Sequence, residues 1–272
     1  MQVIYINLDR QADRRAHLQK DIASFFPQTW KIERFPAIDK NSLDISKLGA
    51  RGAPGAIALS MGHREAVRRS VGIDDHLILL EDDTRLSPRT AQGIELAIKE
   101  LERQPWDIIF TDACIPSIQN MVQLFVAKKS CDMRLNVVDL HNMQFAGTSS
   151  LVFNKNSKEK YLELLNDSVI FTQPIDLLIK QFVWQNRLKA FLTVPYLTSL
   201  SKDADASEIQ AKGTEMNNLL WNSFRRLMFI DSDPNAFDEG LACFPKDLIQ
   251  EDTHRLGMLI AMQASWSVHR MK

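Results

Sequence analysis

The chain has 272 residues and a mass of 31.1 kDa, enough for one large α/β domain or for a domain of about 200 residues with an appendage. Its 33 basic and 34 acidic residues leave a formal net charge of −1, so the overall charge gives no reason to expect a nucleic-acid partner. No apolar run approaches the roughly 20 residues that span a bilayer, and Met1 to Asn7 lack the features of a secretory signal. Cys114, Cys131 and Cys243 form no close pair, which argues against a disulfide framework or a zinc site. We therefore expect a cytoplasmic protein.

Strands and helices are predicted to alternate along the first 200 residues. The predicted strands cover residues 3–8, 30–38, 76–80, 106–111, 145–153 and 188–194. The predicted helices cover residues 9–26, 56–71, 88–103, 155–165 and 174–185, and residues 49–55 are predicted to form a loop. This alternation predicts an α/β domain over residues 1–200, with a mainly parallel sheet and helices on both faces.

The character of the sequence changes after about residue 201. Residues 202–212 are polar, and two amphipathic segments follow at 216–230 and 246–263. We expect residues 201–272 to form a C-terminal helical extension packed on the same domain. The first segment mixes aromatic residues with arginines, which suits contact with an anionic membrane surface. The alternative, which we favour, is an amphipathic helix packed in the core.

The most informative pattern is a buried strand that runs directly into Glu81, Asp82 and Asp83. In open α/β sheets, ligands bind beyond the carboxyl ends of the strands. Adjacent carboxylates repel one another, so a hard cation such as Mg²⁺ or Mn²⁺, shared with phosphate oxygens, would favour this cluster. Because alternate residues of an extended segment point in opposite directions, Glu81 and Asp83 are the predicted metal ligands, and Asp82 is the predicted anchor of the loop. The alternative is a solvated acidic turn that caps the next helix.

One functional hypothesis for this cluster is a signalling domain. The strand that ends near Asp112 resembles part of a response-regulator receiver, in which Asp112 would be the phospho-acceptor, Thr148 the switch hydroxyl and Lys155 the phosphate-sensing lysine. The interval from Asp82 to Asp112 is short for a receiver, and a long stretch of α/β sequence precedes the acidic strand. The resemblance is therefore local.

A second resemblance covers more of the chain. Six segments carry it in order, namely VIYINLDR at 3–10, RFPAID at 34–39, GAI at 55–57 followed by His63, LLEDD at 79–83, GTSS at 147–150 and PID at 174–176. Together they resemble glycosyltransferase family 25, which contains bacterial lipooligosaccharide glycosyltransferases and collagen galactosyltransferases. The resemblance extends over residues 3–210. The chain departs from the family pattern around His63, where Ala56 and Ala58 stand, and at Leu151, where an aromatic residue is usual.

The resemblance implies a GT-A type enzyme with a Rossmann-like sheet that transfers a hexose with inversion. The implied donor is UDP-galactose or UDP-glucose, and the implied acceptor is a surface glycan or glycolipid such as lipooligosaccharide. Peripheral contact with the cytoplasmic face of the inner membrane is compatible with such an acceptor. The resemblance also assigns Glu81 and Asp83 to a Mn²⁺ or Mg²⁺ ion that stabilises the leaving diphosphate. A third hypothesis is a nucleotide-sugar-binding protein that catalyses no transfer.

The resemblance further implies the residues that bind the nucleotide. The uridine and ribose would be cradled by Asn7, Leu8, Asp9 and Arg10. Arg10, Arg14 or Arg15 would meet phosphate oxygens, because guanidinium groups match their geometry. The alternative for Arg14 and Arg15 is a solvated helix face.

An inverting transfer needs a general base, and Asp176 is the first candidate. Its alternative role is that of a carboxylate at a helix N-terminus, where it interacts favourably with the helix dipole. Asp112 is the alternative base or a ligand of the acceptor. His63 would hydrogen-bond to the nucleotide loop, or it is a buried structural histidine.

Overall fold

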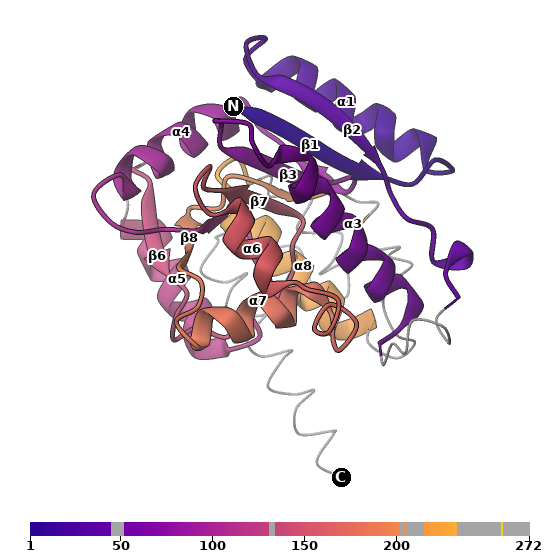
Figure 1. Cartoon of the computed structure of the whole chain (residues 1–272). Helices are drawn as coiled ribbons and strands as arrows, with labels where there is room; N and C mark the ends of the chain where they lie inside the picture. The colour runs from indigo at the N-terminus through magenta and orange to yellow at the C-terminus, as the bar shows by residue number, and fades with distance from the viewer. Residues whose placement is uncertain (45–51, 131–133, 202–203, 205–214, 233–256, 258–272) are drawn as a thin grey trace.

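The computed structural model describes residues 1–44, 52–130, 134–201, 204, 215–232 and 257. Within them the chain forms a seven-stranded sheet with helices on both faces (Figure 1). In spatial order the strands are β2 (Lys31–Pro36), β1 (Gln2–Asn7), β3 (Leu77–Glu81), β7 (Ser150–Phe153), β5 (Ile108–Phe110), β8 (Ala190–Val194) and β6 (Asn136–Asp139). Strands β7 and β6 run antiparallel to the other five. The prediction of an α/β fold with a mainly parallel sheet is confirmed.

Strands β1, β3, β7, β5 and β8 are buried on both faces, so their apolar residues contribute to two separate cores. In β1, Val3 and Tyr5 contribute to one core, and Ile4 and Ile6 contribute to the other. The first core is covered by α1 (Ala12–Phe25) and α4 (Thr90–Leu101). The second is covered by α3 (Pro54–Ser70), α5 (Ile118–Ser130), α6 (Lys158–Leu164), α7 (Ile175–Trp184) and α8 (Glu215–Met228). A short helix η1 (Lys40–Ser42) and a two-stranded sheet of β4 (Thr84–Arg85) and β9 (Ser199–Leu200) complete the described elements.

Five elements were not predicted, namely α5, β6, η1, β4 and β9, and one predicted strand is shorter than expected. Helix α5 buries Met121, Leu124 and Phe125, whereas β6 is an edge strand of only four residues. The strand predicted over 145–153 begins only at Ser150, because Gly147 has φ +85° and interrupts the extended backbone. The predicted segments 202–212 and 246–263 lie outside the described residues except for Ala204 and Gly257.

Helix α8 packs into the second core. Phe224, Leu227 and Met228 are at most 2% exposed, and they belong to the same cluster as the sheet. Arg225 and Phe229 are also buried. The burial of these residues supports the core-packed alternative, and contact of this segment with a membrane stays a prediction. No helix within the described residues is long and apolar enough to cross a membrane.

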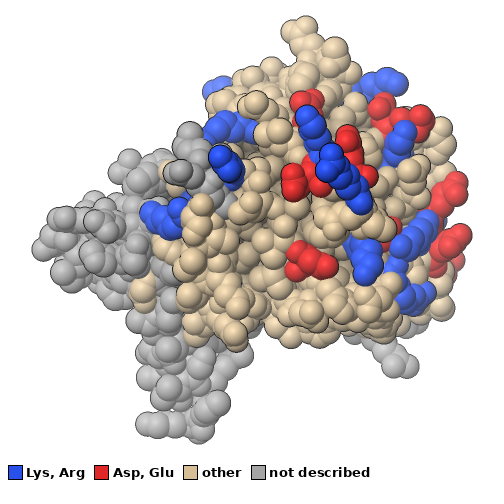
Figure 2. Space-filling model, turned by 90° about the vertical axis from the view of Figure 1, so that its left-hand side faces the viewer, with Lys and Arg blue, Asp and Glu red and all other residues tan. Residues whose placement is uncertain are grey.

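Charged side chains of both signs are distributed over the surface. On the face shown in Figure 2, Lys and Arg side chains stand among Asp and Glu side chains. This distribution agrees with the near-zero formal charge of the whole chain.

The strand order places a crevice between β1 and β3. From β1 the chain passes through α1 on one face to β2, and it then returns through α3 on the other face to β3. Strand β1 therefore lies between β2 and β3, and Ile6 near its end pairs with Glu81. Ligands of open α/β sheets bind beyond the carboxyl ends of the strands, at a point where the order reverses in this way.

Gly93 marks a close contact between α4 and the segment after β8. A Cβ atom at this position would lie 2.3 Å from Cδ2 of Leu197, which is fully buried. We expect Gly93→Ala to cost about 1–3 kcal/mol of stability and to lower the melting temperature measured by circular dichroism. Gly62→Ala in α3 is the control, because its nearest atoms are 3.9 Å away and alanine favours the helix. Equal melting temperatures for the two variants would contradict this packing.

Candidate active site

Two adjoining lobes of a cleft lie beyond the carboxyl ends of β1 and β3. The first lobe has a volume of about 120 Å³ and is lined by residues that follow β1, by residues 37–40, by α3 and by the acidic turn. The second has a volume of about 330 Å³ and is lined by α3, residues 147–149, the start of α7 and α8. Leu59, Glu81 and Asp83 line both lobes. The two carboxylates therefore stand at the junction between two binding spaces.

Asn7 connects the end of β1 to the acidic turn. Its side chain is buried, and Nδ2 donates to Oδ2 of Asp82 at 2.8 Å and to the carbonyl oxygen of Gln11 at 3.0 Å. Its Oδ1 accepts from Nε of Arg34 at 3.2 Å. Asp82 also accepts from Nη1 of Arg14 at 3.4 Å. Burial raises the pKa of Asp82, and the contacts with Asn7 and Arg14 oppose that rise.

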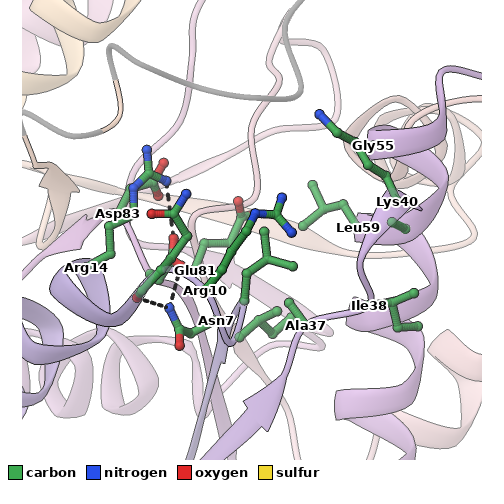
Figure 3. Close-up of a pocket in the computed structure, with 15 residues that line it drawn as sticks. Asn7, Arg10, Arg14, Ala37, Ile38, Lys40, Gly55, Leu59, Glu81 and Asp83 are labelled. Atoms are coloured by element: carbon green, nitrogen blue, oxygen red, sulfur yellow. Dashed lines mark hydrogen bonds and ion pairs between the residues drawn. The ribbon is translucent and has the colours of Figure 1, made fainter. Parts of the chain in front are cut away.

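Four residues predicted to bind the nucleotide line the first lobe together with Asp82, namely Asn7, Leu8, Arg10 and Arg14. In Figure 3, Asn7, Arg14, Glu81 and Asp83 gather on one side of the cavity, and Ala37, Ile38, Gly55 and Leu59 lie on the other together with Lys40. The lobe thus has one polar wall and one largely apolar wall.

The prediction for Asp9 does not fit this lobe. Its side chain is 80% exposed, pairs with Arg34 and does not line the cavity. The sequence analysis also assigned no role to Arg34, which donates to the carbonyl oxygen of Asn7 at 3.1 Å as well as to its side chain. Arg34 opens the RFPAID segment, which was a signal that it belongs to the site.

Glu81 is held from two sides. Its Oε1 accepts from the hydroxyl of Thr148 at 2.7 Å and lies 3.2 Å from Nε2 of His63. Burial by itself would raise the pKa of Glu81, but the contacts with His63 and Thr148 and the charge of Arg225 bring it below its ordinary value. Glu81 is therefore ionised at neutral pH.

His63 contacts Glu81. The ring is fully buried in α3 and lines neither lobe. Its Nδ1 has no hydrogen-bond partner among the described residues. Glu81, which His63 contacts, lines the cleft, so this arrangement favours the buried structural role, and a contact of His63 with the nucleotide loop stays a prediction.

Asp83 has an unusual environment for a carboxylate. Its Oδ1 is buried without a hydrogen-bond partner among the described residues. Burial, together with repulsion by Glu81, raises the pKa of Asp83 to about 7. A buried oxygen that lacks a donor and lies beside a second carboxylate fits a hard divalent cation.

The protein alone supplies few ligands for such an ion. The described residues contain no group of three or more His, Cys, Asp or Glu side chains placed to hold a metal. An ion at Glu81 and Asp83 would therefore need further oxygen ligands from water or substrate, as is usual for Mg²⁺. The metal assignment stays a prediction.

Asp176 lies at the start of α7 and lines the second lobe with Glu81 and Asp83. Its Oδ2 accepts from the backbone N–H of Gly147 at 3.0 Å, and its Oδ1 accepts from the N–H of Leu177 at 2.9 Å. The carboxylate thus occupies a helix N-terminus and faces the cleft at the same time. The geometry is compatible with both of its predicted roles.

Asp112 does not take part in the cleft. It is 1% exposed and lines neither lobe. Its Oδ2 accepts from Nε and Nη2 of Arg225 at 2.9 and 2.5 Å, and its Oδ1 accepts from the hydroxyl of Ser149 at 2.7 Å. The predicted roles of base, acceptor ligand and phospho-acceptor are not carried forward, because the carboxylate is inaccessible and already paired.

The other residues of the receiver hypothesis are not gathered around Asp112 either. Thr148 donates to Glu81, as described above. Lys155 pairs with Asp74, which precedes β3 and thus lies at the opposite end of that strand from the acidic turn. The residues needed for phosphorylation are therefore spread over both edges of the sheet.

No family model matches the sequence, and no curated protein matches it. Interpretation of the site therefore depends on its geometry and on the motifs of the sequence. Those motifs converge, since the segments around Asn7, Glu81, Thr148 and Asp176 all border one cleft.

We expect Asp83→Asn to stabilise the metal-free protein. The pKa of Asp83 rises from an ordinary value of 3.8 to about 7 on folding, so the ionised carboxylate opposes folding above pH 7 and has no such effect below about pH 4, where it is protonated in both states. With a chelator present, the melting temperature of the variant at pH 8 should exceed that of the wild type by roughly 2–5 °C, and the difference should shrink as the pH falls toward 4.

Asp112→Asn is the comparison variant in the same melting-temperature measurements. Its carboxylate is paired with Arg225, so this substitution should lower the melting temperature. If Asp83→Asn also melts below the wild type at pH 8, the account of Asp83 as an unbalanced charge is wrong.

Proposed function

We propose that the protein is a glycosyltransferase of the GT-A type that transfers a hexose, galactose or glucose, from a UDP-sugar to a surface glycan such as lipooligosaccharide, with inversion. The observation that carries the proposal is the junction of two lobes at Glu81 and Asp83. A transferase must hold donor and acceptor so that both reach one reactive centre. Two adjoining lobes with carboxylates at their boundary support such an arrangement.

The first lobe supports a nucleotide donor. Its polar wall carries Arg10 and Arg14, whose guanidinium groups suit phosphate oxygens, and its other wall is apolar enough for a base or ribose. It also lies where the strand order reverses. The sugar of the donor would then reach the junction at Glu81 and Asp83, which line both lobes.

The acidic turn supports assistance by a metal. A divalent ion held by Glu81 and Asp83, together with diphosphate oxygens, would supply positive charge for the leaving group. Neighbouring residues hold the carboxylates of the turn in place through hydrogen bonds. His63 and Thr148 hold Glu81, and Asn7 and Arg14 hold Asp82.

Asp176 is the proposed general base. Its two backbone hydrogen bonds fix the carboxylate at the wall of the second lobe, and each oxygen retains a lone pair for a further donor. A hydroxyl of the acceptor in that lobe would give its proton to Asp176 as it attacks the donor sugar.

A nucleotide-sugar-binding protein without turnover is the remaining alternative, and assays of binding and transfer separate the two. Cytoplasmic location and peripheral contact with the inner membrane remain part of the proposal, because they follow from the proposed acceptor.

Titration calorimetry with UDP, with and without Mn²⁺, tests the donor site, and GDP serves as the control nucleotide. The wild type should bind UDP selectively and only with metal. Asp83→Asn should lose at least tenfold in metal-dependent affinity, because one of two protein ligands is neutralised. Asp74→Asn, an exposed carboxylate at the other end of β3, should bind like the wild type. Undiminished binding by Asp83→Asn would remove the metal assignment.

Asp176→Asn tests the base. An asparagine can still accept the hydrogen bond of Gly147, so UDP binding should stay within about twofold of the wild type, whereas UDP release in the presence of truncated lipooligosaccharide should fall roughly 100-fold or more. Asp167→Asn, at a side chain that is 85% exposed, is the matched control. Normal turnover by Asp176→Asn would exclude Asp176 as the base.

A further inference from the structure

Arg225 brings a partly unbonded guanidinium to the wall of the second lobe. It comes from α8, outside the 3–210 segment that resembles the glycosyltransferase family. The residue is 6% exposed. Its Nε and Nη2 donate to Asp112, and Nη2 also donates to the hydroxyl of Ser149. No described residue accepts a hydrogen bond from Nη1. Because Arg225 lines the second lobe, Nη1 can donate to a ligand or to water there.

The free nitrogen lies close to the proposed base. A Cβ atom built on Gly147 would be 3.7 Å from Nη1 of Arg225, and the N–H of the same Gly147 donates to Oδ2 of Asp176 at 3.0 Å. Arg225 and Asp176 therefore flank one glycine. The absence of a side chain at Gly147 leaves the space beside Nη1 open.

The orientation of Nη1 is fixed by the rest of the group. A guanidinium is planar, and two of its three nitrogens are already held by Asp112 and Ser149. Arg225 and Asp176 both line the second lobe, so a ligand in that lobe meets a guanidinium and a carboxylate. These two groups are the donor and the acceptor that a sugar hydroxyl requires.

We propose that Arg225 contacts the acceptor, with Nη1 donating to the hydroxyl oxygen that faces Asp176. This inference rests on the proposed function of the cleft. In the transfer step the hydroxyl proton passes to Asp176, the oxygen forms a bond to the anomeric carbon, and the bond between that carbon and UDP breaks with its electron pair retained by UDP. Arg225 stabilises the negative charge that develops on the attacking oxygen.

The charge of the second lobe also restricts the acceptor. Glu81, Asp83 and Asp176 line it, whereas Arg225 is the one described Lys or Arg in its lining and is already balanced by Asp112. Without a bound cation, an acceptor that carries a phosphate or carboxylate would meet unfavourable charge here. The metal-free lobe therefore favours a neutral, hydroxylated group.

Saturation-transfer difference NMR on the full chain tests this contact. The probes are methyl β-D-galactopyranoside and methyl β-D-glucopyranoside, with glucose 6-phosphate as the anionic comparator. We expect Arg225→Lys, which keeps the charge but loses Nη1, to weaken binding of the neutral glycosides at least fivefold. Asp112→Asn disturbs the same buried ion pair but keeps Nη1, so it should lower the melting temperature and weaken binding clearly less than Arg225→Lys does.

Gly147→Ala keeps the test decisive if Arg225→Lys does not fold. Its methyl group would project to within 3.7 Å of Nη1 and should reduce binding of the glycosides. Because Gly147 has φ +85°, alanine also strains the backbone there, so the fold of this variant is checked by circular dichroism before its binding is compared. Equal losses in Arg225→Lys and Asp112→Asn, or undiminished binding in a folded Arg225→Lys or Gly147→Ala variant, would overturn the contact. Tighter binding of glucose 6-phosphate than of the methyl glycosides would overturn the charge argument.

Titration with UDP and Mn²⁺ separates failure of the Arg225 contact from failure of the proposed function. If the wild type binds UDP but neither glycoside, the role of Arg225 fails and the donor site stands. If UDP does not bind, the proposed function fails, whatever the glycosides do.

Discussion

The carbonyl oxygen of Ser149 is the contact that fixes the acidic turn. It accepts from the N–H of Glu81 and from the hydroxyl of Thr84, each at 2.7 Å. This contact exists because β7 runs antiparallel to β3, so that the residues before β7 lie beside the end of β3. From the same short segment, Thr148 reaches Glu81 and Gly147 reaches Asp176. A parallel strand in this place would have delivered these residues to the opposite edge of the sheet.

The carboxylates of the cleft differ in the groups that compensate their negative charge. Glu81 has His63 and Thr148, Asp82 has Asn7 and Arg14, and Asp176 has two backbone N–H groups. Oδ1 of Asp83 has no such partner among the described residues, and its charge is opposed by burial and by Glu81. Local instability of this kind is common where a protein holds a site ready for a ligand that balances the charge.

The sequence predicted the strands and helices whose apolar residues form a clear local pattern. Strands β1 and β3 were predicted from their apolar runs, because a strand that is buried on both faces requires such a run. The carboxylates that follow β3 were visible in the same segment. Helix α5 and edge strand β6 were missed, and β6 is short and only partly buried. The pairing of Arg225 with Asp112 was beyond prediction, since the two residues are 113 positions apart and only the tertiary structure brings them together.

The same pairing shows why the predicted boundary at residue 200 does not separate the site from the extension. Arg225 balances the buried charge of Asp112 and lines the second lobe, while Phe224 and Leu227 on the same helix fill the core. Without α8, Asp112 would be a buried carboxylate that lacks its counter-ion, a loss that typically costs about 3–5 kcal/mol. The cleft is thus assembled from both ends of the described chain, and a domain that stopped at residue 200 would lack one wall of its second lobe.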